Sequence, residues 1–331
     1  MYSLFLPKKY LFFVFCLLSF PYSVLASLPG DTIISADKIL MGTFSNDATF
    51  RTDYYYTQGI AANLIHPGFR KSPVNKILLA NKRRGLHYFG LKLSYDGFTP
   101  LSIEDPNIRY GDRPYAAYIY ATQYTVQMNP IKKERLTAAL DLGFMGPGAG
   151  TKGFQTQVHQ WLDAPAPQGW DYQIKTDLVL GYTATYEKGL ISRYKAAELI
   201  GLANASLGTL YTNAQTGLLL RTGKMNGYFQ NIGIAARQNR INQQQFQFYA
   251  QGRLTGKLVG YNATLQGGVL NPNNVYTISG HDIKRTVLQK SAGLVGAYKG
   301  FSFESSVVWL SPEFKNGLSH KYMFFEVRFI I

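Results

Sequence analysis

Strict alternation of apolar and polar residues is the dominant pattern along the chain, and it is typical of β-strands whose two faces meet different surroundings. In 87–96, leucine and aromatic side chains alternate with lysine, serine and aspartate. The same alternation returns in 135–144, 174–187 and 325–331. A helical period would place apolar residues three and four positions apart, so these stretches predict strands.

The pattern predicts twelve strands. Their expected ranges are 38–45, 54–65, 87–97, 115–128, 134–144, 171–187, 191–207, 210–222, 246–267, 285–298, 301–312 and 320–331. Many reach the roughly 9–11 residues that a membrane-spanning strand needs, whereas ordinary strands have about 5–6. Single-chain bacterial barrels have an even number of strands. We therefore expect an all-β fold, a twelve-stranded antiparallel transmembrane β-barrel, with a large soluble β-sandwich as the alternative.

The two faces of the barrel are expected to differ in chemistry. We expect charged side chains on the lumen face and Leu, Phe and Tyr on the lipid face. Tyr118, Tyr120 and Tyr124 share one face of the strand 115–128 and are expected to belong to an interfacial aromatic girdle. If the N-terminus starts in the periplasm, connections after odd-numbered strands lie on the outer side. The least periodic stretch, 223–245, is then a long turn on the inner side.

Composition supports a membrane barrel. Charged residues make up 16% of the 331 residues, against about 25% in soluble domains. Tyrosine (24), phenylalanine (21) and glycine (32) are plentiful. Outside the N-terminal segment, no apolar stretch reaches the roughly 18 residues of a spanning helix. These features point away from a cytosolic enzyme.

The first 26 residues predict a secretory signal peptide. Lys8 and Lys9 precede a short apolar stretch, and a small-residue cleavage site ends at Ala26. We therefore divide the chain into a signal peptide, 1–26, and a barrel, 27–331. The single cysteine, Cys16, lies within the signal peptide, which excludes an internal disulfide framework in the mature chain.

Charge points to an anionic partner. The chain has 34 Lys and Arg against 19 Asp and Glu, a net charge of +15. Removing the signal peptide with its two lysines leaves +13. For an exported chain, phosphorylated lipid is the natural anionic partner. Nothing in the pattern indicates a nucleic acid or an obligate protein partner.

Standard catalytic motifs are mostly missing from the sequence. Gly148 to Gly153 matches G-x-G-x-x-G, but dinucleotide-binding strands read as apolar runs, and the preceding strand carries Arg135 and Asp141. We interpret this glycine cluster as the start of a flexible loop. The G-x-S-x-G nucleophile elbow and the H-E-x-x-H metalloprotease motif do not occur.

The stretch 151–170 predicts a short helix in an outer loop. Apolar residues recur there at helical spacing until Pro165 and Pro167 end the helix. Gln155 and His159 lie one turn apart on an adjacent face. Loops held by a rigid scaffold often carry catalytic groups, so His159 is a candidate, with an ordinary surface histidine as the alternative.

Two further polar clusters fall on the same outer side. Asn46 and Asp47 end the first strand, and a segment from Asp53 opens the second. Such residues are common turn formers, but a carboxylate with amide and carbonyl oxygens is also what Ca²⁺ selects. The third cluster precedes the fourth strand, where Asp112 and Arg113 form either a charge pair that orders the loop or, for Arg113, a contact to a lipid phosphate.

At these residues the sequence resembles the outer-membrane lipid A 3′-O-deacylase family. The matching pieces are Asn46-Asp47, Asp53 with Tyr56-Thr57-Gln58-Gly59-Ile60, Asp112-Arg113-Pro114-Tyr115-Ala116, and Gly146-Pro147 through Gln155 and His159 to Pro167-Gln168-Gly169-Trp170. The resemblance implies a twelve-stranded barrel that removes the 3′-linked acyloxyacyl group of lipid A and depends on Ca²⁺.

The resemblance also implies roles for individual residues. His159 would be the general base and Asp47 a calcium ligand. Asn46, Thr57 and Gln155 would complete the catalytic site. Because the chain lacks a cysteine or serine nucleophile motif, direct attack by water is the simplest route, and a histidine with a pKa of about 6.5 can accept the proton near neutral pH.

Two positions depart from the family's pattern. The loop after the third strand can carry an active-site Lys in the family, where this chain has the stretch 101–105, ending in Asp105. A Glu can follow the histidine in the family, where this chain has Asp163. Arg113 and Asp105 are the candidate substrate-binding residues. The alternatives to a deacylase are a non-catalytic barrel (a pore or an adhesin) and another lipid-modifying enzyme, such as a phospholipase or a palmitoyl transferase.

Overall fold

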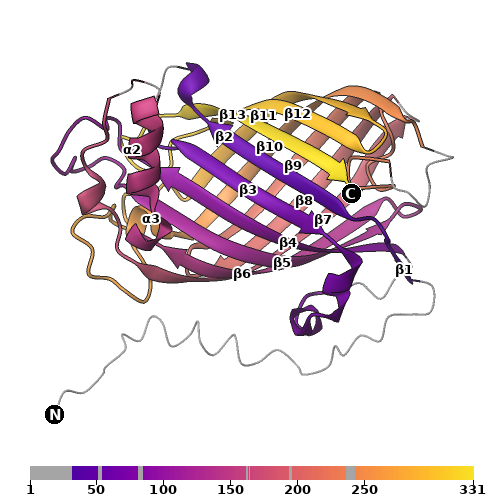
Figure 1. Ribbon diagram of the computed structural model, residues 1–331, viewed down its shortest axis with the longest axis horizontal. Coiled ribbons are helices and arrows are strands. Elements are labelled where there is room, and N and C mark those ends of the chain that lie inside the picture. The colour runs from indigo at the N-terminus through magenta and orange to yellow at the C-terminus, as the bar shows by residue number, and fades with distance from the viewer. Residues whose placement is uncertain are drawn as a thin grey trace, which may run out of the picture.

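The computed structural model describes residues 32–50, 54–80, 85–161, 163, 165–193, 196–235 and 243–331. Within these residues, twelve antiparallel strands close into a barrel, because the last strand pairs with the first of the twelve (Figure 1). The expected signal peptide, 1–26, lies outside the described residues and stays a prediction.

The barrel strands run in chain order around the wall, and a short additional strand, β1 (Thr32–Ile34), pairs in parallel with the start of one of them, β4. The twelve are β2 (Ile39–Asn46), β3 (Gln58–Ile65), β4 (Gly85–Phe98), β5 (Ala116–Asn129), β6 (Glu134–Met145), β7 (Asp177–Arg193), β8 (Ala197–Gly208), β9 (Tyr211–Lys224), β10 (Phe246–Asn262), β11 (Thr286–Tyr298), β12 (Phe301–Leu310) and β13 (His320–Ile330).

The short helical elements lie in the connections between strands. The helices are α2 (Thr151–Trp161) and α3 (Ala263–Gln266), and the 3-10 turns are η1 (Ala48–Phe50), η2 (Pro67–Lys71), η3 (Pro73–Lys76), η4 (Pro147–Ala149) and η5 (Trp170–Tyr172). None of the helices in the described residues is both long and apolar enough to cross a membrane.

The predicted strands match the observed ones, but five strand ends differ by four or more residues, among them the start of β8, which lies at Ala197 rather than at 191. The second begins at Gln58 rather than at 54, and Tyr55, just before it, has a left-handed backbone with φ of 71°. β7 lies several residues later than its predicted range. The strand predicted to end at 267 ends at Asn262, because its side chain accepts a hydrogen bond from the backbone of Thr264 and begins α3.

The predicted division of faces is confirmed for leucine, phenylalanine and charge. Leu91 and Leu93 of β4 are 42% and 50% exposed on the outside of the wall. Inside, Arg328 pairs with Glu326, the two charged positions of the C-terminal alternation. A wall that exposes leucines on the outside and buries charged residues on the inside is typical of a membrane barrel and not of a soluble sandwich.

The tyrosines of β5 are a correction to this picture. Tyr118 and Tyr124 are buried in clusters on the lumen side, so they are not part of an outer aromatic girdle. Tyr124 donates a hydrogen bond of 2.8 Å to Asn63 of β3, and its ring lies over Gly90 of β4, the strand between them. A tyrosine ring is large enough to fill the interior of a small barrel, and its hydroxyl can still bond to other polar groups in the lumen. This accounts for tyrosine side chains that point inward rather than outward.

The two ends of the barrel differ in their connections. Long connections, including the one that carries α2, lie at the end on the left of Figure 1, and tight turns such as 130–133 and 299–300 lie at the other. Outer-membrane barrels place longer loops outside and short turns in the periplasm, so the end with α2 is the outer one. The polar clusters around residues 46–57, 99–115 and 146–170 therefore lie on the outer side, as predicted.

The long turn after β9 lies on the inner side, as predicted, and it enters the lumen. Tyr228 donates a hydrogen bond of 2.6 Å to Glu187 of β7, and its carbonyl accepts one of 2.9 Å from Arg135 of β6. The Arg135 guanidinium also lies 4.1 Å from the centre of the Tyr228 ring. Residues 225–235 thus fill the inner end of the barrel.

Candidate active site at the outer rim

Helix α2 stands at the outer rim with its apolar side turned away from the protein. Phe154 and Trp161 are 42% and 76% exposed, whereas Gln155 is 1% exposed. Phe154 packs edge-on against Tyr95 of β4, with ring centroids 5.8 Å apart. The periodicity that predicts this helix therefore marks its exposed surface, and the polar face meets the barrel. Leu162 and the side chain of Val158 lie outside the described residues.

A chain of hydrogen bonds connects the buried face of α2 to the ends of β2 and β3. Trp170 donates from its indole nitrogen to Oε1 of Gln155 at 2.6 Å. The Gln155 amide donates to Oγ1 of Thr57 at 3.2 Å. The Asn46 side chain donates to the carbonyl oxygen of Thr57 at 2.6 Å. The structure thus brings together three of the predicted site residues, Asn46, Thr57 and Gln155.

Trp170 is fixed by close packing between two outer loops. Its ring lies 4.8 Å from that of Tyr115, and the indole is fully buried. A Cβ on Gly169 would collide with the Tyr115 ring, so this position requires glycine. The carbonyl of Ile103 accepts hydrogen bonds from the Tyr115 hydroxyl at 3.3 Å and from the Gln168 backbone at 2.8 Å. The loop that follows α2 is therefore held against the loop before β5.

His159 lies one helical turn beyond Gln155, and its ring orientation is set by a proline carbonyl. Nδ1 lies 2.6 Å from the carbonyl oxygen of Pro165. A carbonyl oxygen can only accept, so Nδ1 carries the hydrogen, and in the neutral ring the lone pair is then on Nε2. This is the tautomer that a general base acting through Nε2 requires.

Asp47 lies directly after β2, where its carboxylate orders the start of the next connection. It is 2% exposed, and its Oδ2 accepts a hydrogen bond of 3.1 Å from the backbone of Tyr54. Its own carbonyl accepts from the backbone of Phe50 at 2.9 Å. Asp53, the other acidic residue of this cluster, lies outside the described residues.

The oxygen donors around Asp47 fit a hard cation and not zinc. Among the described residues, no group of three or more His, Cys, Asp or Glu side chains is placed to hold a metal ion. The position offers the Asp47 carboxylate, and Asn46 beside it in the chain carries an amide oxygen. Such donors suit Ca²⁺, whereas zinc sites use nitrogen or sulfur ligands.

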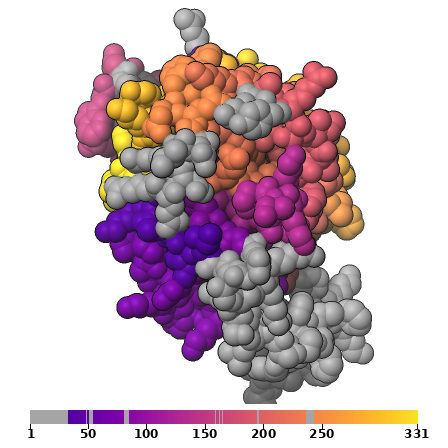
Figure 2. Space-filling view, turned by 90° about the vertical axis from the view of Figure 1, so that its right-hand side faces the viewer, coloured from indigo at the N-terminus to yellow at the C-terminus, as the bar shows by residue number. Residues whose placement is uncertain are grey.

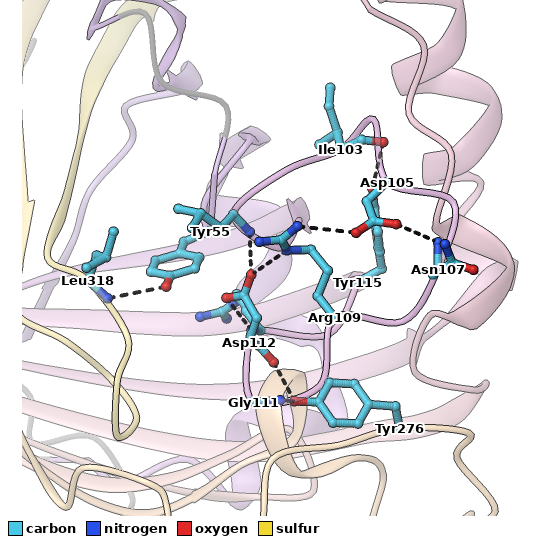
Figure 3. Close-up of polar contacts among 12 residues, drawn as sticks. Tyr55, Ile103, Asp105, Asn107, Arg109, Gly111, Asp112, Tyr115, Tyr276 and Leu318 are labelled. Atoms are coloured by element: carbon cyan, nitrogen blue, oxygen red, sulfur yellow. Dashed lines mark hydrogen bonds and ion pairs between the residues drawn. The ribbon is translucent and has the colours of Figure 1, made fainter.

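Asp105 belongs to a compact charged cluster in the loop before β5 (Figure 3). It accepts hydrogen bonds from the Asn107 backbone at 2.9 Å and from Arg109 at 3.2 Å. These two neighbours lower its pKa, with the Asn107 backbone hydrogen bond as the larger cause. Asp112 pairs with the other side of Arg109 at 3.3 Å and accepts from the Leu101 backbone at 2.8 Å. Asp105 is thus engaged within its own loop.

Arg113 is a correction to both of its predicted roles. Its side chain is 1% exposed and pairs with Glu313 at 2.6 Å, not with Asp112. A second nitrogen donates to Thr264 at 2.7 Å, and the guanidinium lies 4.3 Å from the centre of the Phe98 ring. A side chain buried in this way does not reach a lipid phosphate. Arg113 instead ties the rim of β5 to the loop after β12.

The outer loops are also joined to one another by two tyrosine hydroxyls, those of the buried Tyr55 and the half-buried Tyr276. Tyr276 accepts a hydrogen bond from the Gly111 backbone at 2.8 Å and donates one to the Asp112 carbonyl at 2.7 Å (Figure 3). Tyr55 accepts from the Leu318 backbone at 3.2 Å, and burial raises the pKa of Tyr55 to about 12. Both phenols are therefore neutral connectors of the rim at physiological pH.

Two site residues escaped the sequence-based prediction. Trp170 was recognised only as part of a motif, although it supplies the donor that holds Gln155. Pro165 was interpreted as a helix stop, although its carbonyl orients His159. Two sequence features single out Trp170: it follows a glycine, and the chain has only three tryptophans. A contact of a backbone carbonyl leaves no signal in the sequence.

A solved structure at low sequence identity shares the fold of this chain. The solved structure of LpxR from Salmonella typhimurium superposes with a TM-score of 0.72, at 18% sequence identity, and covers 88% of this chain and 100% of its own. The β-domain of the Bordetella autotransporter BrkA covers 89% of this chain and 100% of its own, with 13% identity and a TM-score of 0.44. No curated protein sequence matches the chain.

The family assignment rests on a sequence profile that spans nearly the whole chain. The profile of the outer membrane protein LpxR matches residues 11–329. It includes the four motif pieces on which the resemblance rested. The chain is therefore a barrel of the Gram-negative outer membrane, and it belongs to the LpxR family of outer membrane proteins.

Proposed function

We propose that this protein is a lipid A 3′-O-deacylase that hydrolyses the ester of the 3′-linked acyloxyacyl group. The observation that carries the proposal is the pair Gln155 and His159 on α2, in which one residue is locked into the rim and the other is held in the base-competent tautomer. Membership of the LpxR family and the position of α2 at the lipid side of the outer end support the same substrate.

The reaction requires one base and one water molecule. His159 Nε2 takes a proton from water, and the resulting hydroxide attacks the ester carbonyl carbon. The bond between that carbon and the 3′-oxygen of the sugar breaks, and the proton passes from His159 to the leaving oxygen. The Pro165 carbonyl stabilises the imidazolium that forms in between, because it accepts the Nδ1 hydrogen in both states.

Calcium is part of the proposal. Asp47 would hold the ion, with neighbouring amide and backbone oxygens and water completing the shell. When bound, the ion would polarise the ester carbonyl and stabilise the oxyanion. Asn46, Thr57 and Gln155 position the two sides of the site through their hydrogen bonds, and they leave the reacting proton to His159.

The inner end of the barrel argues against the pore alternative. Tyr228 of the turn bonds to the neighbouring residues Arg135 of β6 and Glu187 of β7, and Ile234 of the same turn packs against Ile39 and Met41 of β2. A conducting barrel of this strand number would need that turn to leave. We therefore expect no stable conductance in planar bilayers.

The test compares lipid A from cells that produce the wild-type protein or His159→Gln. Mass spectrometry should show loss of the 3′ acyloxyacyl mass with the wild type, and the purified variant should lose about 10²–10⁴-fold in turnover, the usual contribution of a general base. The heat-modifiable gel shift of the variant should stay unchanged. Turnover of glycerophospholipid with intact lipid A would show a phospholipase instead.

A further inference from the structure

The connection between β3 and β4 contains two capped 3-10 turns on the inner half of the barrel, and the proposed function does not use it. It comprises residues 66–80, here called the outer-wall segment, and contains η2 and η3. The ring of His66 caps η2 by accepting from the Gly68 backbone at 3.0 Å, and Ser72 caps η3 by accepting from Val74 at 3.3 Å. Figure 1 shows it projecting from the wall near the start of β4.

This segment satisfies polar side chains on the lipid-facing surface of β5. Gln123 accepts a hydrogen bond from Ser72 at 2.8 Å and donates one to Asn75 at 3.4 Å. Gln127, four residues further along β5, donates to the carbonyl of Leu79 at 3.4 Å. Amides that face hydrocarbon without partners would be costly, so the segment acts as their cover.

Strand β7 holds the C-terminal end of the segment, residues 77–79. Tyr182 of β7 accepts a hydrogen bond from the Leu79 backbone at 2.7 Å and donates one to the Ile77 carbonyl at 3.2 Å. Leu78 turns inward and is 5% exposed, whereas Ile77 and Leu79 turn outward and are 60% and 52% exposed. The segment is therefore held against the barrel with two apolar side chains pointing into the surroundings.

The same segment carries positive charge only. Arg70, Lys71 and Lys76 are exposed, and no Asp or Glu occurs between residues 66 and 80. Within the described part of the chain, none of the three forms an ion pair, whereas Lys188 and Lys315 at other turns each have an acidic partner. Figure 2 looks onto this inner end, where the purple part of the chain forms the lower left of the surface.

We propose that the outer-wall segment is a membrane anchor for the inner leaflet that binds the phosphate groups of anionic phospholipids. Ile77 and Leu79 enter the boundary of the acyl chains, and Arg70, Lys71 and Lys76 meet the headgroup phosphates. Apolar residues beside unpaired basic residues are the pattern of interfacial elements, and charge complementarity selects anionic over neutral lipid. This proposal is independent of the hydrolytic activity at the outer rim.

The experiment uses the full-length mature protein, folded into vesicles of phosphatidylcholine alone or with phosphatidylglycerol. The urea midpoint of unfolding is read from the heat-modifiable gel shift. The wild type should gain stability when the anionic lipid is present, and added salt should reduce the gain. The triple variant Arg70→Gln, Lys71→Gln, Lys76→Gln should fold normally in the neutral vesicles and lose most of the gain.

A matched control removes three other exposed lysines from tight turns of the same end, in the variant Lys132→Gln, Lys133→Gln, Lys299→Gln. It changes the net charge equally and should keep the gain. An equal loss in both triple variants would overturn the proposal, because it would show general attraction between the protein and the membrane. A wild type whose midpoint ignores the anionic lipid would overturn it as well.

Discussion

The substitution Trp170→Phe tests whether the buried hydrogen-bond chain positions the site. It removes the indole hydrogen that reaches Gln155 at 2.6 Å and leaves the Gln155 carbonyl oxygen without that donor in a fully buried place. An unpaired buried polar group costs about 1–3 kcal/mol. Because about 1.36 kcal/mol corresponds to a factor of ten, the ordered position of α2 should become less populated by roughly 5- to 150-fold.

The effect should appear in turnover, since His159 lies on the same helix one turn from Gln155. We expect kcat for release of the 3′ acyl group from lipid A to fall by up to that factor, while the gel shift of the folded barrel stays. Trp161→Phe is the matched control, because Trp161 belongs to the same helix but is 76% exposed. Its turnover should equal that of the wild type.

Two results would refute this reasoning. If Trp170→Phe keeps both the wild-type kcat and the wild-type urea midpoint, the contact with Gln155 contributes nothing to the site. If Trp161→Phe loses as much turnover as Trp170→Phe, the loss reflects the contact of α2 with lipid and not the buried chain. The double variant with Gln155→Ala should lose less than the sum of the two single losses, because the residues are in contact.

Three further predictions concern the metal, the rim and the inner end. EDTA should stop deacylation and Ca²⁺ of about 10⁻⁴–10⁻³ M should restore it, whereas Asp47→Asn should respond poorly to added Ca²⁺. Glu313→Gln leaves Arg113 without its buried counter-ion and should lower the free energy of unfolding by about 3–5 kcal/mol. Burial opposes the charged form of Glu313, but Arg113 prevails and lowers the pKa of Glu313 below 4.5. The loss of stability in Glu313→Gln relative to the wild type should therefore be complete above pH 4.5. It should vanish as the pH falls through the pKa of Glu313 in the folded protein. Tyr228→Phe loses the 2.6 Å bond to Glu187 and should cost about 1–3 kcal/mol in urea unfolding, with turnover at the opposite end unchanged.

The strands could be predicted because the two sides of a barrel wall impose opposite chemistry on neighbouring residues. Leu91 and Leu93 face lipid and Asp96 faces the lumen, so alternation is read directly. The direction of Tyr118 could not be predicted in the same way. A tyrosine side chain is stable both at a membrane interface and in a polar lumen. Alternation shows only that Tyr118 and Tyr124 share a face of the strand.

The features of the site that depend on one segment of the chain could be predicted, and the contacts between two distant segments could not. The helical period indicated α2, and spacing placed Gln155 and His159 one turn apart. The helical period shows that the apolar residues share one side of α2, but it does not show whether that side faces the barrel or the surroundings, and in the structure Phe154 and Trp161 face outward. The partner of Arg113 cannot be predicted from sequence for a related reason, since Glu313 lies 200 residues away in the chain.

The turn that enters the inner end also bears on how the barrel is assembled. Ile234 of this turn packs in one cluster with Ile39 and Met41 of β2, and Ile330 of β13 packs against the same cluster. β2 and β13 are the strands whose pairing closes the cylinder. The turn between β9 and β10 therefore supplies part of the core behind this seam, and we expect removal of the Ile234 side chain to weaken the contact between β2 and β13.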